Sequence, residues 1–397
     1  MNKSIHFAGQ PTFAQLIKLV PKDLIARQVS ECRSDYYKKF TTWHHLNAML
    51  FACFGHCHSL REVVSGMRAL EGRLQSCDIR YFPTRSTFSE ANAKRTSEVF
   101  ERIYLSLKKH WDGFLPDSQS KERLYLMDST TIKLFQEIFK GSGLSKSDGR
   151  RKGGLKVHMA VQSDQSAPSV VRITDGASND MTFTKYVSLP PGSTIIMDRG
   201  YRDYRQYNSW TQNGVRWITR MRPHSYLQKL QSHPLSPEEK QKGVRKDETL
   251  QMGFPQKRIT KVTARCITYT DPTSKKKFQF ITNDFQSPPS LIAHLYRKRW
   301  GIELLFKRLK QNMPLQYFLG DNQNAIRIQI WCALIADLLI QVIQKQVKRK
   351  WAFSNIVSLV RLHLFNYLNL YSFLENPEAT TIFSRPPDIQ LKFTLSG

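Results

Sequence analysis

The spacing of apolar residues along the chain changes twice. Up to about residue 118, apolar side chains recur every three or four positions, as in residues 44–57 and 59–74, and this spacing predicts helices. From residue 123 onward they alternate with polar residues or form short runs, which predicts strands. After about residue 286 the helical spacing returns. We therefore expect a strand-rich core between two helical regions.

The central region predicts an α/β arrangement with mixed strands. The expected strands cover residues 123–134, 154–162, 169–176, 193–198 and 215–221. Helices are expected over residues 181–189 and 203–214. Residues 226–285 interrupt this pattern, because a polar, irregular stretch leads there to two further strand-like runs. We expect a mostly β insertion with a basic surface.

The segment 287–313 follows the insertion and predicts one strong helix. Prolines lie at its start and Pro314 lies after its end, as is usual for helix boundaries. The most apolar run, residues 326–343, contains Arg327 and Asp337. These charges favour a buried helix over a membrane span.

The charge of the chain is strongly unbalanced. Sixty Lys and Arg residues face 32 Asp and Glu residues, which gives a net charge of +28. The positive residues are spread along the whole chain, so we expect a polyanionic partner that is met over a broad surface, with nucleic acid as the first candidate. A generically basic, soluble protein is the alternative.

The six cysteines are sparse and irregularly spaced. This spacing argues against a disulfide framework and for a reducing compartment. Cys53 and Cys57 lie near His56 and His58, but they stand in an apolar helical run and match no zinc module, so we expect them in the core. The N-terminus shows no signal peptide pattern, and we expect a cytoplasmic protein that is not bound to a membrane.

One N-terminal helix has the composition of a DNA-contacting element. Pro83 ends the preceding element, and Thr87 with Glu90 forms a possible capping box. A helix-turn-helix presents such polar and basic residues to a DNA groove. The candidate contacts in this helix are Arg85, Thr87, Lys94 and Arg95. The alternative is a solvated helix face that packs on its neighbour.

Two expected strands each end in an apolar run followed by aspartate, LYLMD at Asp128 and TIIMD at Asp198. Acids at such strand ends lie where open α/β sheets form their sites. A third acid, Glu303, stands alone among the six Lys and Arg residues of the segment 296–310. Three carboxylates around one point repel each other unless cations lie between them. Mg²⁺ prefers such oxygen ligands, and two ions can promote phosphodiester cleavage.

The helix that carries Glu303 is expected to present its charges together. At about 100° per residue, Tyr296, Arg299, Glu303 and Lys310 fall within a stripe roughly 60° wide. The acid could hold metal while the basic residues grip the phosphates of the strand that is cut. Tyr296 and Trp300 could stack on unpaired bases. The alternative is an ordinary surface helix with i,i+4 salt bridges, such as one from Glu303 to Lys307.

These spacings resemble a known family. The pattern Y-x2-R-x3-E-x6-K, formed by Tyr296, Arg299, Glu303 and Lys310, is similar to the signature of the DDE transposases of bacterial insertion sequences. MDSTTI, which contains Asp128, and DRGY, which begins at Asp198, resemble the motifs around the first two acids of that family. The order of the acids, with a long β insertion before the glutamate, also matches, and the resemblance covers nearly the whole chain.

The resemblance implies a ribonuclease-H-like catalytic core that is interrupted by the β-rich insertion. It implies that Asp128, Asp198 and Glu303 bind two Mg²⁺ ions, with Mn²⁺ as a substitute. The enzyme would cut double-stranded DNA at terminal inverted repeats and join the 3′-ends to target DNA, with hairpin ends and a synaptic homodimer. Tyr296, Arg299, Trp300, Lys307 and Lys310 would contact the DNA. Lys156 and His158 of KGGLKVH would contribute a phosphate contact or support for the site.

The expected organisation then has five parts. They are a helical N-terminal DNA-binding domain (1–118), the first part of the core (119–225), the β-rich insertion (226–285), the second part of the core with the glutamate helix and C-terminal helices (286–375), and a tail (376–397). Three other functions stay open. They are a nuclease of the same fold that does not join DNA, a non-catalytic DNA-binding regulator derived from a transposase, and an RNA-processing enzyme.

Overall fold

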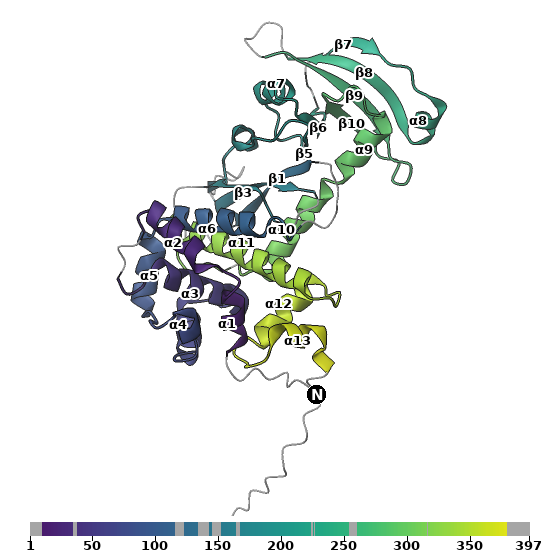
Figure 1. Cartoon of the computed structure of the whole chain (residues 1–397). Helices are drawn as coiled ribbons and strands as arrows, with labels where there is room; N and C mark the ends of the chain where they lie inside the picture. Colours follow the sequence, from purple (N-terminus) through teal and green to yellow (C-terminus); the bar gives the residue numbers. More distant parts are fainter. Residues whose placement is uncertain are drawn as a thin grey trace, which may run out of the picture.

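A large mixed sheet, with helices from both ends of the chain packed together on one side of it, forms the molecule (Figure 1). The computed structural model describes residues 10–34, 38–115, 123–133, 143–144, 152–163, 167–223, 225, 227–253, 260–315 and 317–378. The tail expected over residues 376–397 lies almost entirely outside the described residues.

The N-terminal region is helical, as its apolar spacing predicts. Its helices are α1 (Thr12–Ile17), α2 (Lys22–Glu31), α3 (Thr42–Gly55), α4 (Leu60–Ala69), α5 (Arg85–Lys94) and α6 (Ser97–Trp111), with a short 3₁₀ turn η1 (Gln75–Cys77). The capping box expected at Thr87 is wrong by three positions. The hydroxyl of Thr84 accepts the hydrogen bond from the backbone N–H of Thr87 at 3.2 Å, so α5 begins one turn earlier.

The central sheet has ten strands. They are β1 (Leu124–Lys133), β2 (Gly143–Leu144), β3 (Lys152–Gln162), β4 (Val170–Asp175), β5 (Thr194–Met197), β6 (Arg216–Arg220), β7 (Leu227–Ser232), β8 (Val244–Met252), β9 (Val262–Thr270) and β10 (Lys277–Thr282). Their order is β2-β3-β1-β5-β6-β10-β9-β8-β7, with β4 paired to β3. β3 is antiparallel to both β1 and β4, whereas β1, β5 and β6 run parallel to one another.

The strands of the segment 226–285 extend this sheet. β10 pairs antiparallel with β6, and β9, β8 and β7 follow outward. Of the described helices between strands, only α8 (Pro237–Gln241) lies within this segment, between β7 and β8. The 3₁₀ helix η2 (Asp180–Tyr186) precedes β5, and α7 (Tyr204–Gln212) precedes β6. The pair Arg265–Asp247 links β9 to β8 within the buried part of the insertion, through bonds of 2.9 and 2.7 Å.

The single helix expected over residues 287–313 is two helices in the structure. These are α9 (Pro289–Arg297) and α10 (Trp300–Asn312). At the junction the N–H of Arg299 donates to the carbonyl of Tyr296 and that of Gly301 donates to Lys298, three residues back in each case. These tighter turns break the regular helix at the place where the signature residues lie.

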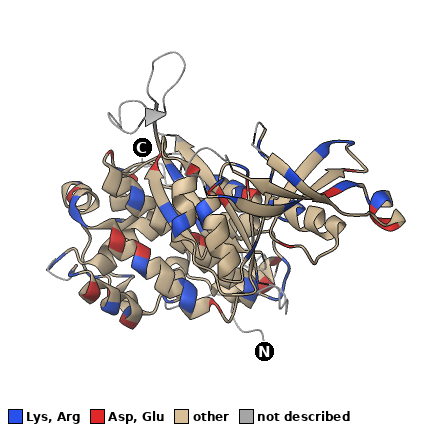
Figure 2. Ribbon diagram, turned by 90° about the horizontal axis from the view of Figure 1, so that it is seen from above, with Lys and Arg blue, Asp and Glu red and all other residues tan. Residues whose placement is uncertain are grey.

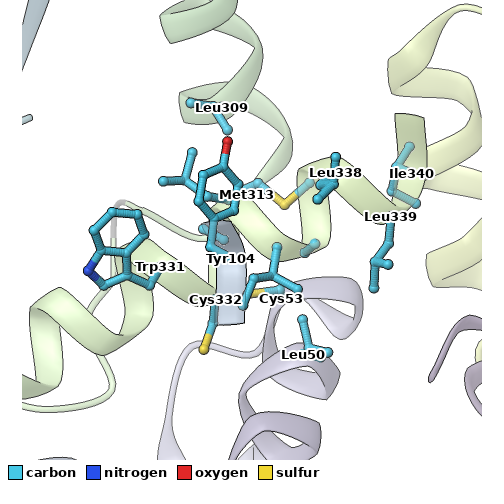
Figure 3. Close-up of a cluster of buried hydrophobic side chains, with 14 of the residues drawn as sticks. Leu50, Cys53, Tyr104, Leu309, Met313, Trp331, Cys332, Leu338, Leu339 and Ile340 are labelled. Carbon is cyan, nitrogen blue, oxygen red and sulfur yellow. The ribbon is translucent and has the colours of Figure 1, made fainter. Parts of the chain in front are cut away.

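The C-terminal helices complete a helical layer together with the N-terminal ones. They are α11 (Gln323–Gln346), α12 (Phe353–Leu362) and α13 (Leu370–Glu375). α11 packs against α3, α5 and α6, and side chains of α3, α6, α10 and α11 meet in one apolar core (Figure 3). Cys53 and Cys57 are buried in this core, as their apolar surroundings predict.

α11 alone among the described helices has the length and apolar character of a membrane span. Its most apolar window is 94% buried inside the molecule. Its acidic residue Asp337 is 1% exposed and accepts two hydrogen bonds, of 3.0 and 2.8 Å, from the guanidinium of Arg308 in α10. The helix is thus the centre of the helical layer, and its carboxylate is paired as a buried charge must be.

Candidate active site

The strand pairing brings the two predicted aspartates to one place. β1 and β5 are parallel, and Met127 is level with Met197. Asp128 and Asp198 follow these two residues directly, so both leave the paired segment at the same level. The strand expected over residues 123–134 is confirmed as β1, but it does not end near Asp128, because it continues to Lys133 along β3. Only the pairing of β1 with β5 ends there, so the two strands are no longer hydrogen-bonded to each other at the two acids.

Arg299 joins the first aspartate to the glutamate. Its Nη1 donates to Oδ2 of Asp128 at 2.6 Å, and its Nη2 donates to Oε1 of Glu303. The Arg299 side chain is only 14% exposed. Glu303 therefore lies beside Asp128, as the three-acid hypothesis requires, and its partner is Arg299 and not Lys307.

Arg220 is a site residue that the sequence interpretation did not identify. It lies at the end of β6, and Ile218 is level with Ile196 of β5, so Arg220 lies level with Asp198. Its Nη2 donates to Oδ1 of Asp198 at 2.9 Å. The run VRWITRM carries Arg216 as well as Arg220, so the sequence alone does not single out Arg220.

The two aspartates differ in their affinity for protons. Burial raises the pKa of Asp128 from 3.8 to about 6, and the negative charges of Asp198 and Glu303 add to this effect. The hydrogen bond from the Ser129 N–H and the charge of Arg299 act in the opposite direction and lower this pKa. Burial also acts to raise the pKa of Asp198, but Arg220, the backbone N–H of Arg199 and the charge of Arg299 together outweigh it and leave that pKa below its usual value. Environments that separate the pKa values of neighbouring carboxyl groups are typical of functional sites.

Tyr296 lies within the site but cannot stack on a base as predicted. It is 8% exposed, and its ring lies 4.9 Å from that of Phe280. The guanidinium groups of Arg220 and Arg299 lie 5.8 and 5.9 Å from the ring centre. Its buried hydroxyl has no hydrogen-bond partner within the described ranges. That hydroxyl is available to bind a ligand oxygen, whereas the ring faces are covered and cannot stack on a base.

The other predicted contacts of this helix are at the surface. Trp300 is 59% exposed, so its ring is open to a base, and Lys307 is exposed as well. Lys310 is exposed and donates to the carbonyl of Thr131 at 3.4 Å, three positions along β1 from Asp128. The predicted stripe therefore falls into two groups, because Lys310 lies about two turns beyond Glu303 on α10. Tyr296, Arg299 and Glu303 lie at the acids, and Lys310 lies further along β1.

The N-terminal candidates are not all surface residues. Arg95 is 1% exposed, and its guanidinium donates to the backbone carbonyls of Thr41 and Phe40. Its assignment to DNA binding is therefore corrected, because it holds together the segments before α3 and after α5. Arg85 and Lys94 are exposed and Thr87 is half-buried, and Lys94 pairs with Glu90 at 2.6 Å.

Lys156 and His158 lie on the opposite face of the sheet from Arg299. Lys156 Nζ donates to Oδ1 of Asp180 and to the carbonyl of Ser178, both at 3.1 Å. Burial lowers the pKa of His158 to about 4, so this side chain is neutral at neutral pH. Because Lys156 is hydrogen-bonded to Asp180 and Ser178, it supports the rear face of the sheet and does not offer a free charge to phosphate. Asp180 carried no signal in the sequence.

The donor chemistry of the site fits a hard divalent cation. Its three carboxylates come from three elements and offer the oxygen ligands that Mg²⁺ prefers. Across the described ranges, no three Asp, Glu, His or Cys side chains converge as metal ligands, and at this site arginine groups lie against all three acids. Arg299 thus neutralises Asp128 and Glu303 where a metal ion would do so, and it must move if an ion binds both acids.

A basic cavity adjoins Asp198. Its volume is about 760 Å³, and its lining includes Arg199, Arg202 and Arg222 besides Asp198. None of these three arginines forms an ion pair with a carboxylate among the residues that the structure describes. Three uncompensated guanidinium groups beside an acid cluster favour a polyanionic ligand that approaches the acids from this side.

Comparisons with known proteins identify the family. The family model described as "Transposase DDE domain" matches residues 119–339, and one described as a domain of unknown function (DUF4372) matches residues 8–80. A Sinorhizobium fredii protein named as transposase y4zB is 28% identical over 313 residues, which are 77% of this chain and 84% of that protein. A Synechocystis protein named as the transposase of insertion sequence element IS4SA is 26% identical over 65% of this chain and 71% of that protein.

A third relative and one solved structure are more distant. A Geobacillus stearothermophilus protein named as the transposase of element IS5377 is 27% identical over 60% of this chain and 61% of its own. A piggyBac transposase in a synaptic complex with hairpin DNA aligns over 97% of this chain and 81% of its own, at 9% identity and a TM-score of 0.41, too low to establish a shared fold. The DDE-domain match covers more than half of the chain, and the chain belongs to the DDE transposases of bacterial insertion sequences.

Proposed function

We propose that this protein cuts DNA at the terminal inverted repeats of an insertion sequence and joins the freed 3′-ends to target DNA. The observation that carries this proposal is twofold: Asp128 and Asp198 follow two parallel strands at the same level, and Arg299 joins Asp128 to Glu303. Excision through hairpin ends would belong to the same reaction series. The site of action would be the bacterial nucleoid in the cytoplasm.

The proposed catalytic core is ribonuclease-H-like. The strand order β4-β3-β1-β5-β6 supports it, because the first three strands are antiparallel neighbours and the last three are parallel neighbours. Asp128 lies on the central strand of this set, and Asp198 follows the strand beside it. Such an arrangement lets two strands and one crossing helix place three acids at one edge of the sheet.

Asp128, Asp198 and Glu303 would hold the metal ions, which we propose to be two Mg²⁺ with Mn²⁺ as a substitute. When bound, the ions would activate water or a 3′-hydroxyl and stabilise the leaving oxygen. The acids are the ligands and transfer no proton themselves in this scheme. Arg299, released from Asp128 and Glu303, would then donate its two N–H groups to a phosphate of the cut strand.

The remaining signature residues would position the DNA around the acids. The unpartnered hydroxyl of Tyr296 would donate to the same phosphate. Lys307 and Lys310 would contact phosphates along the strand, and the exposed ring of Trp300 would stack on an unpaired base. The arginine cavity beside Asp198 would receive the DNA backbone on the other side of the acids.

The partner is double-stranded DNA, and two copies of the chain would bring two element ends together. The net charge of +28 supports a broad DNA contact, and Lys and Arg occur on the helices as well as on the extended sheet (Figure 2). Arg85, Thr87 and Lys94 at α5 remain proposed contacts to the repeats. The proposed parts of the chain are those expected from the sequence, with residues 1–118 as the DNA-binding region.

The test uses purified protein and a plasmid that carries its gene with flanking DNA, with Mg²⁺ or with chelator. Cuts at both edges of the element that require Mg²⁺ and disappear in Glu303→Ala are expected. Glu98→Ala, at an exposed acid on α6, is the matched control and should cut normally. Binding without cutting under any metal would contradict the proposal and favour a regulator, and cutting without joined products would favour a nuclease.

A further inference from the structure

A fourth acid lies behind the site, on the opposite face of the sheet. Ser129 and His158 are cross-strand partners in β1 and β3. Side chains alternate along a strand, so Ser129 points away from the face on which Asp128 meets Arg299. Asp180, the first residue of η2, lies against Ser129 on that rear face.

One carboxylate oxygen of Asp180 ties three segments together. Its Oδ1 accepts from the hydroxyl of Ser129 at 3.0 Å and from Nζ of Lys156 at 3.1 Å. The same ammonium group donates to the carbonyl of Ser178 at 3.1 Å, in the loop that leads to η2. β1, β3 and this loop are therefore fixed to one another directly behind Asp128.

The same carboxylate lies beside the turn that begins at Asp198. A Cβ added to Gly200 would lie 3.3 Å from Oδ2 of Asp180, tighter than ordinary contact, so the glycine leaves room for the carboxylate here. Tyr201 is 1% exposed, and its hydroxyl lies 3.4 Å from Nδ1 of His158, whose ring is itself 3.6 Å from Oδ1 of Asp180. The network behind the sheet thus reaches both segments that carry the aspartates.

We infer that Asp180 is a positioning residue that holds Asp128 and Asp198 at the separation required for metal binding, an inference that rests on the proposed function. Asp128 and Asp198 carry like charges on neighbouring strands, so the positions of their backbones set the separation of the two carboxylates. Asp180 braces one segment through Ser129 and the other through His158, whose ring reaches the hydroxyl of Tyr201. Partners behind metal ligands commonly orient them in this way.

The interaction depends on charge as well as shape. The side chain of Lys156 is 16% exposed and Asp180 is its only ion-pair partner in the described part of the chain. Asp180→Asn keeps the size of the side chain but removes the charge, which leaves a largely buried ammonium group without an acid. We expect Ser129 and the loop before η2 to lose their fixed positions in that variant, while the sheet itself remains.

The test measures metal binding directly. Full-length wild type, Asp180→Asn and Asp180→Glu are titrated with Mn²⁺ in the presence of DNA, and free Mn²⁺ is followed by its electron paramagnetic resonance signal. The Mg²⁺ concentration for half-maximal cutting is measured in parallel. Asp180→Asn should weaken Mn²⁺ binding and raise the Mg²⁺ requirement about 10- to 100-fold, and Asp180→Glu should restore part of both. DNA binding in chelator should not change.

Asp203→Asn is the matched control. Asp203 caps α7 and accepts from Thr184 of η2, and asparagine caps helices equally well, so this variant should bind Mn²⁺ like wild type. If Mn²⁺ binding requires Asp128 but is unchanged in Asp180→Asn, the inference about Asp180 is overturned and the proposed function is not. Equal losses in Asp180→Asn and Asp203→Asn, together with weakened DNA binding, would also overturn it. A folded wild type that neither binds Mn²⁺ nor cuts DNA would overturn the proposed function as well.

Discussion

Arginine groups neutralise the candidate site. Arg299 contacts Asp128 and Glu303, and Arg220 contacts Asp198. Guanidinium groups suit this role because they remain charged and can donate to two carboxylates at once. The isolated acid among basic residues in the segment 296–310 is thereby explained, since Glu303 is paired with the arginine one turn before it.

The raised pKa of Asp128 predicts a pH-dependent stability in chelator. The folded state binds this proton more tightly than the unfolded chain, so the contribution of Asp128 to stability is lost as pH rises from about 4 to about 6. The pKa difference corresponds to at most about 3 kcal/mol. We therefore expect Asp128→Asn to exceed wild type in free energy of unfolding by about 1–3 kcal/mol at pH 8.

The measurement is urea unfolding at several pH values with chelator present. The difference between the two proteins should disappear near pH 4, where wild-type Asp128 is protonated. Asp23→Asn, at an exposed acid in the first turn of α2, serves as the control. A variant that is less stable than wild type at pH 8 would show that the pair with Arg299 outweighs the cost of burial.

At the scale of elements, helix boundaries decide which residues meet. The break between α9 and α10 puts the Tyr296 ring against Phe280 and leaves Arg299 at the acids. Close packing also matters here, because a Cβ on Gly301 would lie 3.2 Å from Leu126 of β1. A single straight helix, as the periodicity predicts, would not approach the sheet in this way.

The start of α5 gives a prediction at this scale. Thr84→Ala removes the hydroxyl that accepts from the N–H of Thr87 and should cost about 1 kcal/mol in free energy of unfolding. Glu90→Ala removes only an exposed pair with Lys94 and should cost less than about 0.5 kcal/mol. Chemical unfolding of both variants checks this, and a larger loss in Glu90→Ala would restore the capping box expected from the sequence.

At the scale of the whole molecule, the N-terminal helices are part of the same core as the C-terminal ones. α3, α5 and α6 pack on α11, and their buried side chains belong to one apolar cluster. Figure 3 shows the part of it between α3, α6 and α11. Tyr104 of α6 also donates to the carbonyl of Pro168 at 2.8 Å, next to β4. A DNA-binding region joined in this way would be fixed relative to the acids and not flexibly attached.

This packing predicts that the catalytic region does not fold alone. A chain that begins at residue 119 would expose the surface of α11 that the N-terminal helices cover, and we expect it to be insoluble or to unfold without cooperativity. Expression and thermal unfolding by circular dichroism would test this, with the chain lacking residues 379–397 as the control. A soluble, cooperatively unfolding fragment would show that the two regions are separate domains.

The sequence by itself determined the element types, the order of the three acids and the family pattern. Alternation and helical spacing are local properties, so most strands and helices follow from them. The motifs around Asp128, Asp198 and Glu303 are contiguous, and each could be found without knowing its neighbours in space.

Only the tertiary structure decided how those pieces meet. Arg220 and Asp180 reach the site through strand register and through the rear face of the sheet, and neither contact is encoded in nearby residues. Arg95 reads as a surface cation, and its burial depends on carbonyls more than fifty positions away. Periodicity fixes which face of an element is apolar, but the packing of distant segments determines which charges are buried, paired or left for DNA.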